Sequence, residues 1–459
     1  MFHPAHARRS KPLAAAFSWW AAPTSMRREQ ALRPEALLEM WQASGLKFKL
    51  LFTLAMIFVV RFGVAVPIAG VDNAVVAQAF NQGLLQFIDM FSGGALAKVS
   101  VLAMGIIPYI NASIIIQLMT SVIPKLEEMQ KEGGEAGRRQ IAQITRFLTI
   151  GLATVQAIGF TSWIWRSGAA IGHPAAGPPP VLFLLTTVSV MVCGAVFVMW
   201  IGEMITEYGI GNGASMLIFI GIVGGIPTYV SNTITLVNEG ASNWFAVGLT
   251  VASYLLLIVA VVYATEGARK IPVQSAKRQV GNRVYGGRAT YMPFRLNQGG
   301  VMPIIFASSV LMFPATLQQF APNVGFLKVI TDFLMKQPGY GMFFVTLIFF
   351  FTFFYASMIL NPQEIAANLK RYGSYIPGYR PGRPTAEYLE KILNRLTMCG
   401  AVFLSLIIMF PMFVVALTGV TTLEQVGSTA ILIMVGVAID LFNQLQTHLL
   451  ARQYEGFTT

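Results

Sequence analysis

The feature that most constrains this chain is a succession of long apolar segments separated by polar or basic connections. An α-helix of about 20 apolar residues spans the hydrocarbon core of a bilayer and satisfies its own backbone hydrogen bonds there. Only 11% of the residues are charged, against roughly 25% in an ordinary soluble domain. The sequence therefore predicts an all-α polytopic membrane protein with ten transmembrane helices. The predicted spans are residues 46–67, 99–122, 141–165, 181–205, 214–230, 245–264, 302–320, 341–360, 396–417 and 428–450.

The distribution of Lys and Arg predicts how these spans are oriented. Ten spans place both termini on the same side of the membrane. Of the 32 Lys and Arg, 27 lie at the termini, in the connections on that side or in the span ends next to them, four lie in the opposite connections, and Arg61 lies deeper inside the first span. Because cytoplasmic loops carry an excess of basic residues, both termini are predicted to be cytoplasmic. The net charge of +12 is then mostly a topology signal and not a sign of nucleic-acid binding.

The predicted spans divide the chain into two halves with flanking segments. The first half covers residues 46–230, the second covers residues 231–450, and residues 451–459 form a cytoplasmic tail. Residues 1–45 form an N-terminal cytoplasmic extension, and its first 28 residues hold five Lys or Arg and no acid. This composition fits either a disordered arm or a processed or mis-assigned start before Met26.

Two cytoplasmic connections, residues 265–300 and 361–395, are long and basic. Ordinary connections between neighbouring helices have about 2–8 residues. These two segments therefore either project as docking surfaces or carry solvated charge that only sets the topology.

A short segment at residues 83–98 interrupts the pattern between the first two spans. It combines Phe87 and Phe91 with a break at Gly93 and Gly94, and it is too short and too polar to span a membrane. Such a helix either lies in the membrane interface or re-enters a cavity within the protein.

The second predicted span carries isoleucines at four-residue spacing: Ile106, Ile110 and Ile114. Residues at this spacing share one face of a helix. The face is consistent with helix packing or with the lining of a pore.

Few residues in the spans could support catalysis or ion coupling. Arg61 in the first span and Asp440 in the last either pair or snorkel, or they mark an ion path. The sequence lacks an HExxH helix, a GxSxG elbow and a phosphate-binding GK pair, and Cys193 and Cys399 have no metal-ligand spacing. No catalytic residue, metal or cofactor is therefore expected. A secondary transporter with inverted repeats and an intramembrane enzyme are the rival interpretations.

Six longer strings occur along the chain in order: FIDMFSGGALAKVSVLAMGIIPYINASIIIQLM, EGGEAGRRQIAQITR, WIGEMITEYGIGNGAS, GVMPIIFASSVLMFPAT, NPQEIAANLKRYGSYIPGYRPG and IDLFNQLQTHLLARQYEG. Together they closely resemble the bacterial and plastid-type SecY family of protein-conducting channels. The resemblance runs from about Lys49 to Gly456, and the N-terminal extension lies outside it.

This resemblance implies two inverted pseudo-symmetric halves that form an hourglass with a lateral opening toward lipid and a short re-entrant plug helix. It implies a channel that conducts unfolded secretory polypeptides and releases hydrophobic segments sideways into lipid. The implied partners are SecE and SecG, the SecA motor or the ribosome with its RNA on the cytoplasmic loops, and a preprotein with its signal sequence. The implied host membrane is a bacterial plasma membrane or a thylakoid.

The resemblance also assigns a pore and its closure. An apolar ring disfavours standing water and ions, yet it yields around a polypeptide because it forms no fixed bonds. The ring maps onto Ile106, Ile110, Ile218, Ile305 and Ile433, and the plug maps onto the segment with Phe87, Phe91, Gly93 and Gly94. Met216 or Leu217 would replace Ile218 in this ring after a small register change.

Two further groups of residues follow from the resemblance. The lateral gate maps onto the second and third spans against the seventh and eighth. Ser113, Ser308 and Ser309 lie on these spans, where small residues would let helices separate around a signal sequence. Arg278, Arg380 and Tyr454 map onto the surface for partner docking. An exposed arginine can bind a carboxylate or an RNA phosphate with two parallel hydrogen bonds.

Overall fold

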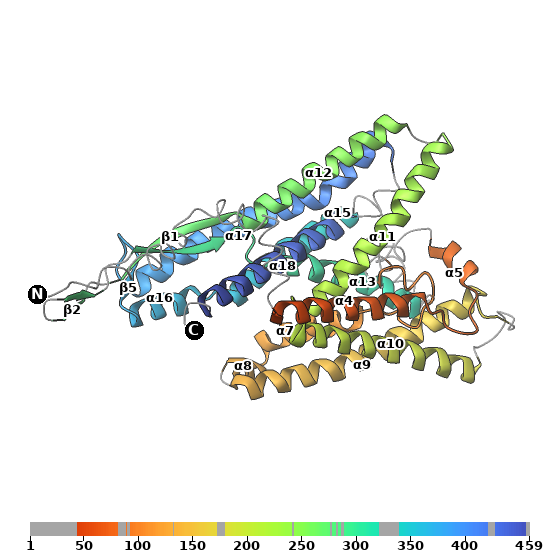
Figure 1. Cartoon of the computed structure of the whole chain (residues 1–459), viewed down its shortest axis with the longest axis horizontal. Coiled ribbons are helices and arrows are strands. Elements are labelled where there is room, and N and C mark those ends of the chain that lie inside the picture. Colours follow the sequence, from red (N-terminus) through yellow and green to blue (C-terminus); the bar gives the residue numbers. More distant parts are fainter. Residues whose placement is uncertain are drawn as a thin grey trace, which may run out of the picture.

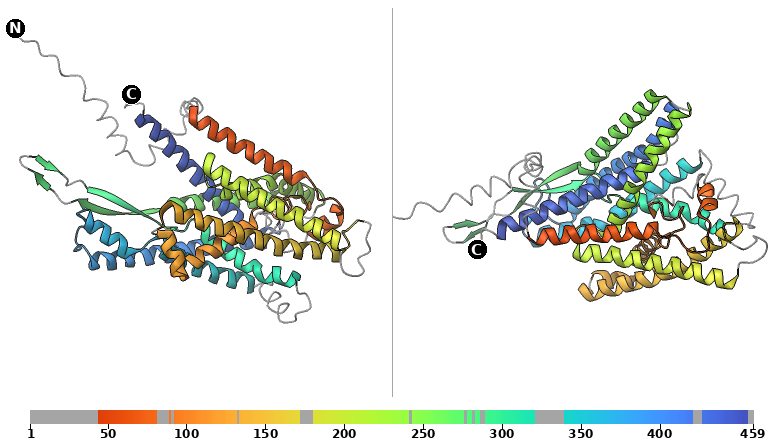
Figure 2. Two further views of the ribbon diagram at one scale, coloured as in Figure 1. Left: turned by 90° about the horizontal axis from the view of Figure 1, so that it is seen from below. Right: turned by 45° about the vertical axis from the view of Figure 1, so that its right-hand side comes forward.

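A computed structural model shows helices running side by side along the long axis of the molecule (Figure 1). A small unit of β-strands projects from one end (Figures 1 and 2). The structure describes residues 44–80, 89, 92–131, 133–171, 180–240, 243–275, 278–280, 283–285, 289–320, 339–420 and 427–455.

Most helices of the first half lie together on one side of the molecule (Figure 1). Five of them, α4, α7, α9, α10 and α11, correspond to the first five predicted spans. The helices are α4 (Ser44–Ala65), α5 (Asn73–Phe80), α7 (Ile107–Val122), α8 (Pro124–Lys131), α9 (Gly134–Arg166), α10 (Val181–Tyr208) and α11 (Gly213–Asn238).

The second half contains the other five predicted spans, in α12, α13, α15, α17 and α18. In the part of the chain that the structure describes, eight helices are each long and apolar enough to cross a membrane, and α7 with α8 form a ninth candidate that is bent by 105°. The prediction of an all-α polytopic membrane protein is therefore confirmed. The helices are α12 (Trp244–Glu266), α13 (Met302–Phe320), α15 (Gly339–Ile359), α16 (Pro362–Arg371), α17 (Arg383–Thr418) and α18 (Ser428–Glu455).

The predicted start of the second span is wrong. Residues 99–106 form turns, and α7 begins only at Ile107. Pro108 lies in the first turn of α7, where its missing N–H costs no helical hydrogen bond. Gly105 before it has φ +53°, a left-handed conformation that interrupts a helix. Val99 and Leu102 are buried within the protein, so their apolar character reflects internal packing and not a lipid-facing helix.

Helices α17 and α18 extend beyond the predicted ninth and tenth spans. Helix α17 begins at Arg383, well before the predicted residue 396, and α18 continues to Glu455 inside the predicted tail. A helix can leave the membrane without ending, so hydropathy marks where lipid contact stops and not where the helical backbone stops. Pro384 near the N-terminus of α17 fixes the start that hydropathy cannot show.

The two long connections, residues 265–300 and 361–395, fold into one β unit. Strand β1 (Ala268–Ser275) pairs antiparallel with β4 (Ala289–Arg295) and with the short β5 (Ser374–Tyr375), and β2 (Arg278–Val280) pairs with β3 (Arg283–Tyr285). The sequence analysis did not predict these strands. Their apolar side chains pack on α17 in a separate cluster of Ile271, Val273, Phe294, Ile376, Leu389, Ile392 and Leu393. The two connections therefore form a folded unit with its own apolar core.

Candidate functional site

Five isoleucines from four parts of the fold belong to one large apolar cluster, which also includes side chains of α10, α12, α15 and α17. They come from the start of α7, from α11, from α13 and from α18. Four are almost fully buried, and the fifth, Ile110, is partly buried against the same cluster. The structure thus brings together all the residues assigned to the pore ring: Ile106, Ile110, Ile218, Ile305 and Ile433.

The packing around Ile106 and Ile218 follows from their neighbours. The Cβ of an alanine at Gly202 in α10 would lie 3.3 Å from Ile106 Cδ1, so the absence of a side chain at Gly202 leaves room for this isoleucine. Met216 and Leu217, the alternatives to Ile218, are buried in the same cluster. All three side chains on this turn of α11 therefore face protein.

The predicted plug is described at its glycine end, while Phe87 and Phe91 lie outside the described residues. Gly93 and Gly94 have φ of +71° and +84°, which only glycine adopts readily. The resulting turn is organised by one carboxylate oxygen, Oδ1 of Asp89. It accepts hydrogen bonds from Leu96 N at 2.9 Å, Ala97 N at 2.9 Å and Ser92 Oγ at 3.1 Å.

The surroundings of Asp89 affect its ionisation in opposite directions. Burial raises the pKa of the Asp89 carboxyl above its ordinary value of 3.8. The Ala97 N–H, the Ser92 hydroxyl, the Leu96 N–H and the charge of Lys98 each lower this pKa, but burial dominates. The carboxyl therefore binds a proton more readily in the folded turn than in an open chain.

Arg61 connects the glycine turn to a neighbouring helix. Its Nη1 donates to the carbonyl oxygen of Gly93 at 3.2 Å. Its Nη2 donates to the carbonyl oxygens of Ile220 and Gly221 in α11, the latter at 3.4 Å. The guanidinium thus bonds backbone carbonyls and forms no ion pair with Asp440, which lines a pocket together with Arg295.

The serines assigned to the lateral gate lie on α7 and α13. Ser308 is buried, and its hydroxyl donates to the carbonyl oxygen of Ile305 at 2.9 Å within α13. Ser113 and Ser309 are half-buried. Helix α13 contacts α9, and α9 contacts α7, so the predicted gate helices of the two halves lie against each other.

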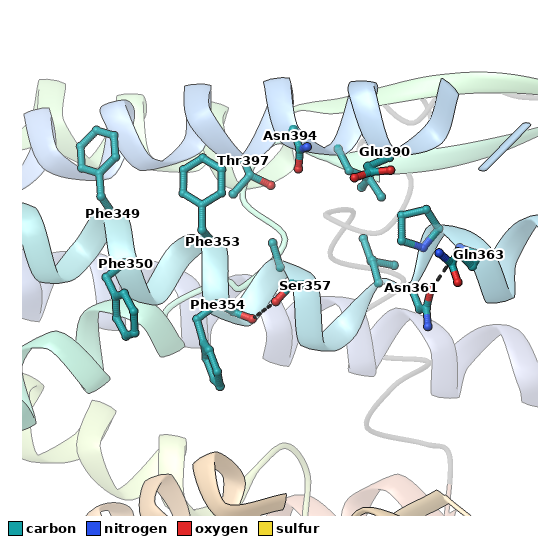
Figure 3. A pocket seen from close by; sticks show the side chains of 14 residues that line it. Phe349, Phe350, Phe353, Phe354, Ser357, Asn361, Gln363, Glu390, Asn394 and Thr397 are labelled. Atoms are coloured by element: carbon teal, nitrogen blue, oxygen red, sulfur yellow. Dashed lines mark hydrogen bonds between the residues drawn. The ribbon is translucent and has the colours of Figure 1, made fainter. Parts of the chain in front are cut away.

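Two grooves that the sequence analysis did not identify lie on either side of α15. One, of about 770 Å³, separates α7, α8 and α9 from α15 and α16; Thr120, Arg138 and Ser357 line it. The other, of about 940 Å³, lies between α15 and α17 (Figure 3). In Figure 3, Phe349 and Phe353 point toward α17, whereas Phe350 and Phe354 point away from it. Only the first groove lies between the predicted gate helices.

The residues assigned to partner docking lie in the β unit with its loops and at the end of α18. Arg380 is exposed in a loop between Gly378 and Gly382, whose φ values are +88° and +113°. The loop is held to α17 because Thr385 Oγ1 donates to the Arg380 carbonyl oxygen at 2.7 Å. Arg278 lies in β2, and Tyr454 lies in the last turn of α18. The side chains of these two residues are not among those that the structure describes.

Asp89 and Arg61 carry most of the polar contacts around the glycine turn, and neither was assigned a role in it from the sequence. An aspartate followed by Ser92 and a glycine pair is a recognisable turn signal. The contacts of Arg61 join segments far apart in the chain, so only the tertiary structure reveals them. In the described part of the chain, no three His, Cys, Asp or Glu side chains come together as metal ligands.

Sequence and structure comparisons agree on the family. The SecY family profile matches residues 100–442. The SecY protein translocase subunits of Synechococcus elongatus and Synechocystis are each 46% identical to this chain, covering 92% of it and 96% of the relative. A solved structure described as a protein conducting channel superposes with a TM-score of 0.63 at 17% identity, covering 87% of this chain and 92% of its own. Sec61 from a canine ribosome-channel complex superposes with a TM-score of 0.59 at 16% identity, covering 87% and 92%.

The fold and the site define an all-α, multi-pass membrane protein with a channel architecture. The extent and identity of the matches specify which one. The chain belongs to the SecY family, the protein-conducting channel subunits of the Sec translocase. It is a translocase subunit and not an enzyme.

Proposed function

We propose that this chain conducts unfolded secretory polypeptides through the apolar cluster around Ile106, Ile218, Ile305 and Ile433. The observation that carries the proposal is the meeting of these residues, which come from both halves of the fold, in one buried cluster. Aliphatic side chains exclude ions without forming directional bonds, so they can separate around a passing chain and close again behind it.

The lateral gate is assigned to the contact between α7 and α9 on one side and α13 and α15 on the other. The half-buried Ser113 and Ser309 offer small side chains at this seam, and the 770 Å³ groove opens toward its cytoplasmic end. A hydrophobic segment that leaves the channel here exchanges contact with apolar side chains for contact with lipid. We infer that signal sequences and membrane-spanning segments leave by this route.

The cytoplasmic β unit is the proposed docking surface for SecA or the ribosome, with SecE and SecG as further subunits. The exposed Arg380 is held by a glycine-flanked loop and so is presented without a large entropy cost. The Sec61 that superposes on this chain comes from a ribosome-channel complex, which supports a ribosome as a partner. The strands, α16 and the C-terminal end of α18 lie at one end of the molecule (Figure 1), which supports cytoplasmic termini.

Export into proteoliposomes tests the proposal. The chain is reconstituted with SecE, and a secretory precursor is added with or without SecA and ATP. Protease-protected precursor that depends on all components is the expected result. Uptake of small solutes without precursor protection, in a preparation with a working positive control, would favour a secondary transporter.

The docking role has its own test. Arg380→Glu should reduce SecA-driven transport while SecE still co-purifies with the channel. Arg166→Glu is the matched control because Arg166 is also exposed but lies in a predicted connection on the opposite side of the membrane. Equal transport by both variants would count against the role of Arg380.

A further inference from the structure

We propose that Arg61 is a positioning residue that anchors the Gly93 turn to α11, so that the turn is released when α4 and α11 move apart. The proposal rests on the proposed channel function, because this turn is part of the predicted plug.

The location of Arg61 requires an explanation. A guanidinium within a membrane-spanning helix is costly unless protein groups or water satisfy its five N–H donors. Within the described residues, Arg61 forms no ion pair, and its hydrogen-bond acceptors are the carbonyl oxygens of Gly93, Ile220 and Gly221. These carbonyls belong to two separate segments. The side chain therefore bridges the turn and α11.

Helix α11 is shaped to receive this side chain. In a helix each Cβ tilts toward the N-terminus, so a side chain four residues later covers part of the preceding turn. The residues four positions after Ile220 and Gly221 are Gly224 and Gly225, which leave both carbonyls open. A methyl group at Gly224 would overlap the guanidinium of Arg61.

The anchored turn is stiff enough for one contact to position it. The Gly94 N–H donates to the Asp89 carbonyl oxygen at 3.0 Å, in addition to the bonds made by the Asp89 carboxylate. A Cβ on Gly93 would lie only 2.9 Å from Gly221 Cα, so the backbones of the turn and α11 are already in close contact. Holding the Gly93 carbonyl therefore holds the turn as a unit. Separation of α4 from α11 would remove one side of the bridge.

The anchor predicts that a buried reporter in the turn becomes reactive when the bridge is lost. Ser92 is 8% exposed, so Ser92→Cys places a thiol in the turn with little change of shape. The exposed Cys193 and Cys399 are first replaced by serine. The full chain with SecE is then placed in nanodiscs, and the rate of labelling by a polar maleimide is measured.

Arg61→Met and Gly224→Ala should each raise the labelling rate by about ten- to a hundredfold, as expected for the loss of one hydrogen bond to a charged group. Arg61→Lys, which keeps the charge but not the planar fork, should give an intermediate rate. Gly248→Ala is the matched control because its added methyl group meets nothing within 4 Å. Retained SecE and an unchanged melting temperature establish that each variant is assembled.

Parental labelling rates in assembled Arg61→Met and Gly224→Ala would overturn the anchor. If Arg61→Met does not assemble, Gly224→Ala decides, because it retains the arginine and removes only its space. Precursor transport by the parent chain separates the two proposals. Normal transport with unchanged labelling refutes the anchor alone, whereas faster labelling in a chain that transports no precursor refutes the channel function and leaves the anchor.

Discussion

Removal of the Asp89 carboxylate should loosen the glycine turn, and the size of the effect can be worked out from its contacts. Oδ1 accepts from the N–H groups of Leu96 and Ala97, both at 2.9 Å, and from the Ser92 hydroxyl. A buried donor left without a partner costs about 1–3 kcal/mol. The Leu96 N–H keeps Ser92 Oγ at 3.1 Å as a second acceptor, which reduces its loss. Asp89→Ala should therefore weaken the turn by about 2 kcal/mol.

The matched variant is Asp89→Asn. Because one oxygen accepts all three bonds, an asparagine Oδ1 can occupy the same place without a buried charge. Hydrogen exchange of the peptide around Leu96 and Ala97, measured on the complex in nanodiscs, reports opening of the turn. A loss of about 2 kcal/mol corresponds to roughly 30-fold faster exchange in Asp89→Ala, with Asp89→Asn close to the parent. Equal exchange in both variants would refute the reasoning.

Three further predictions concern the pH response, the ring and helix packing. Burial raises the pKa of Asp89, so protonation of its carboxyl stabilises the turn fully below pH 3.8. This stabilisation is lost as the pH rises through the raised pKa. Hydrogen exchange in the turn, corrected for its intrinsic pH dependence, should therefore increase across this window in the parent but not in Asp89→Asn. Replacing Ile106 and Ile110 with serine should increase ion leakage in planar bilayers while SecE and SecA still bind, and unchanged leakage counts against the ring. Gly400→Ala should destabilise the protein by about 1–3 kcal/mol, because its Cβ would lie 2.7 Å from the Leu296 carbonyl oxygen. Thermal unfolding, with Gly248→Ala as the control, measures this effect. Equal melting temperatures of the two variants would contradict the prediction.

The β unit cannot be predicted from either long connection taken alone. Residues 265–300 and 361–395 are each basic and long, and each was interpreted as either a docking surface or a carrier of solvated charge. Their strands pair through Gln274 with Tyr375 and Ser275 with Ser374, about a hundred residues apart in the chain. A three-stranded sheet with an apolar face packed on α17 is possible only once both connections emerge side by side.

The sequence by itself determined the membrane class and the family, and it predicts the orientation of the spans. Runs of apolar residues and the distribution of Lys and Arg are local properties, since each span must satisfy its backbone within lipid whatever its neighbours do. The family strings likewise lie in contiguous stretches.

The tertiary structure decided what contiguous stretches do not record. Residues 99–106 look like the start of a lipid-facing helix, but they are buried turns, because hydropathy does not distinguish a protein interior from a bilayer. Arg61 looks like an isolated charge within a span, but its guanidinium joins the Gly93 turn to α11. Its partners are backbone carbonyls, which every residue possesses. Whether they can accept a hydrogen bond from Arg61 depends on glycines at the right positions in a neighbouring helix. The sequence near Arg61 therefore contains no signal for these contacts.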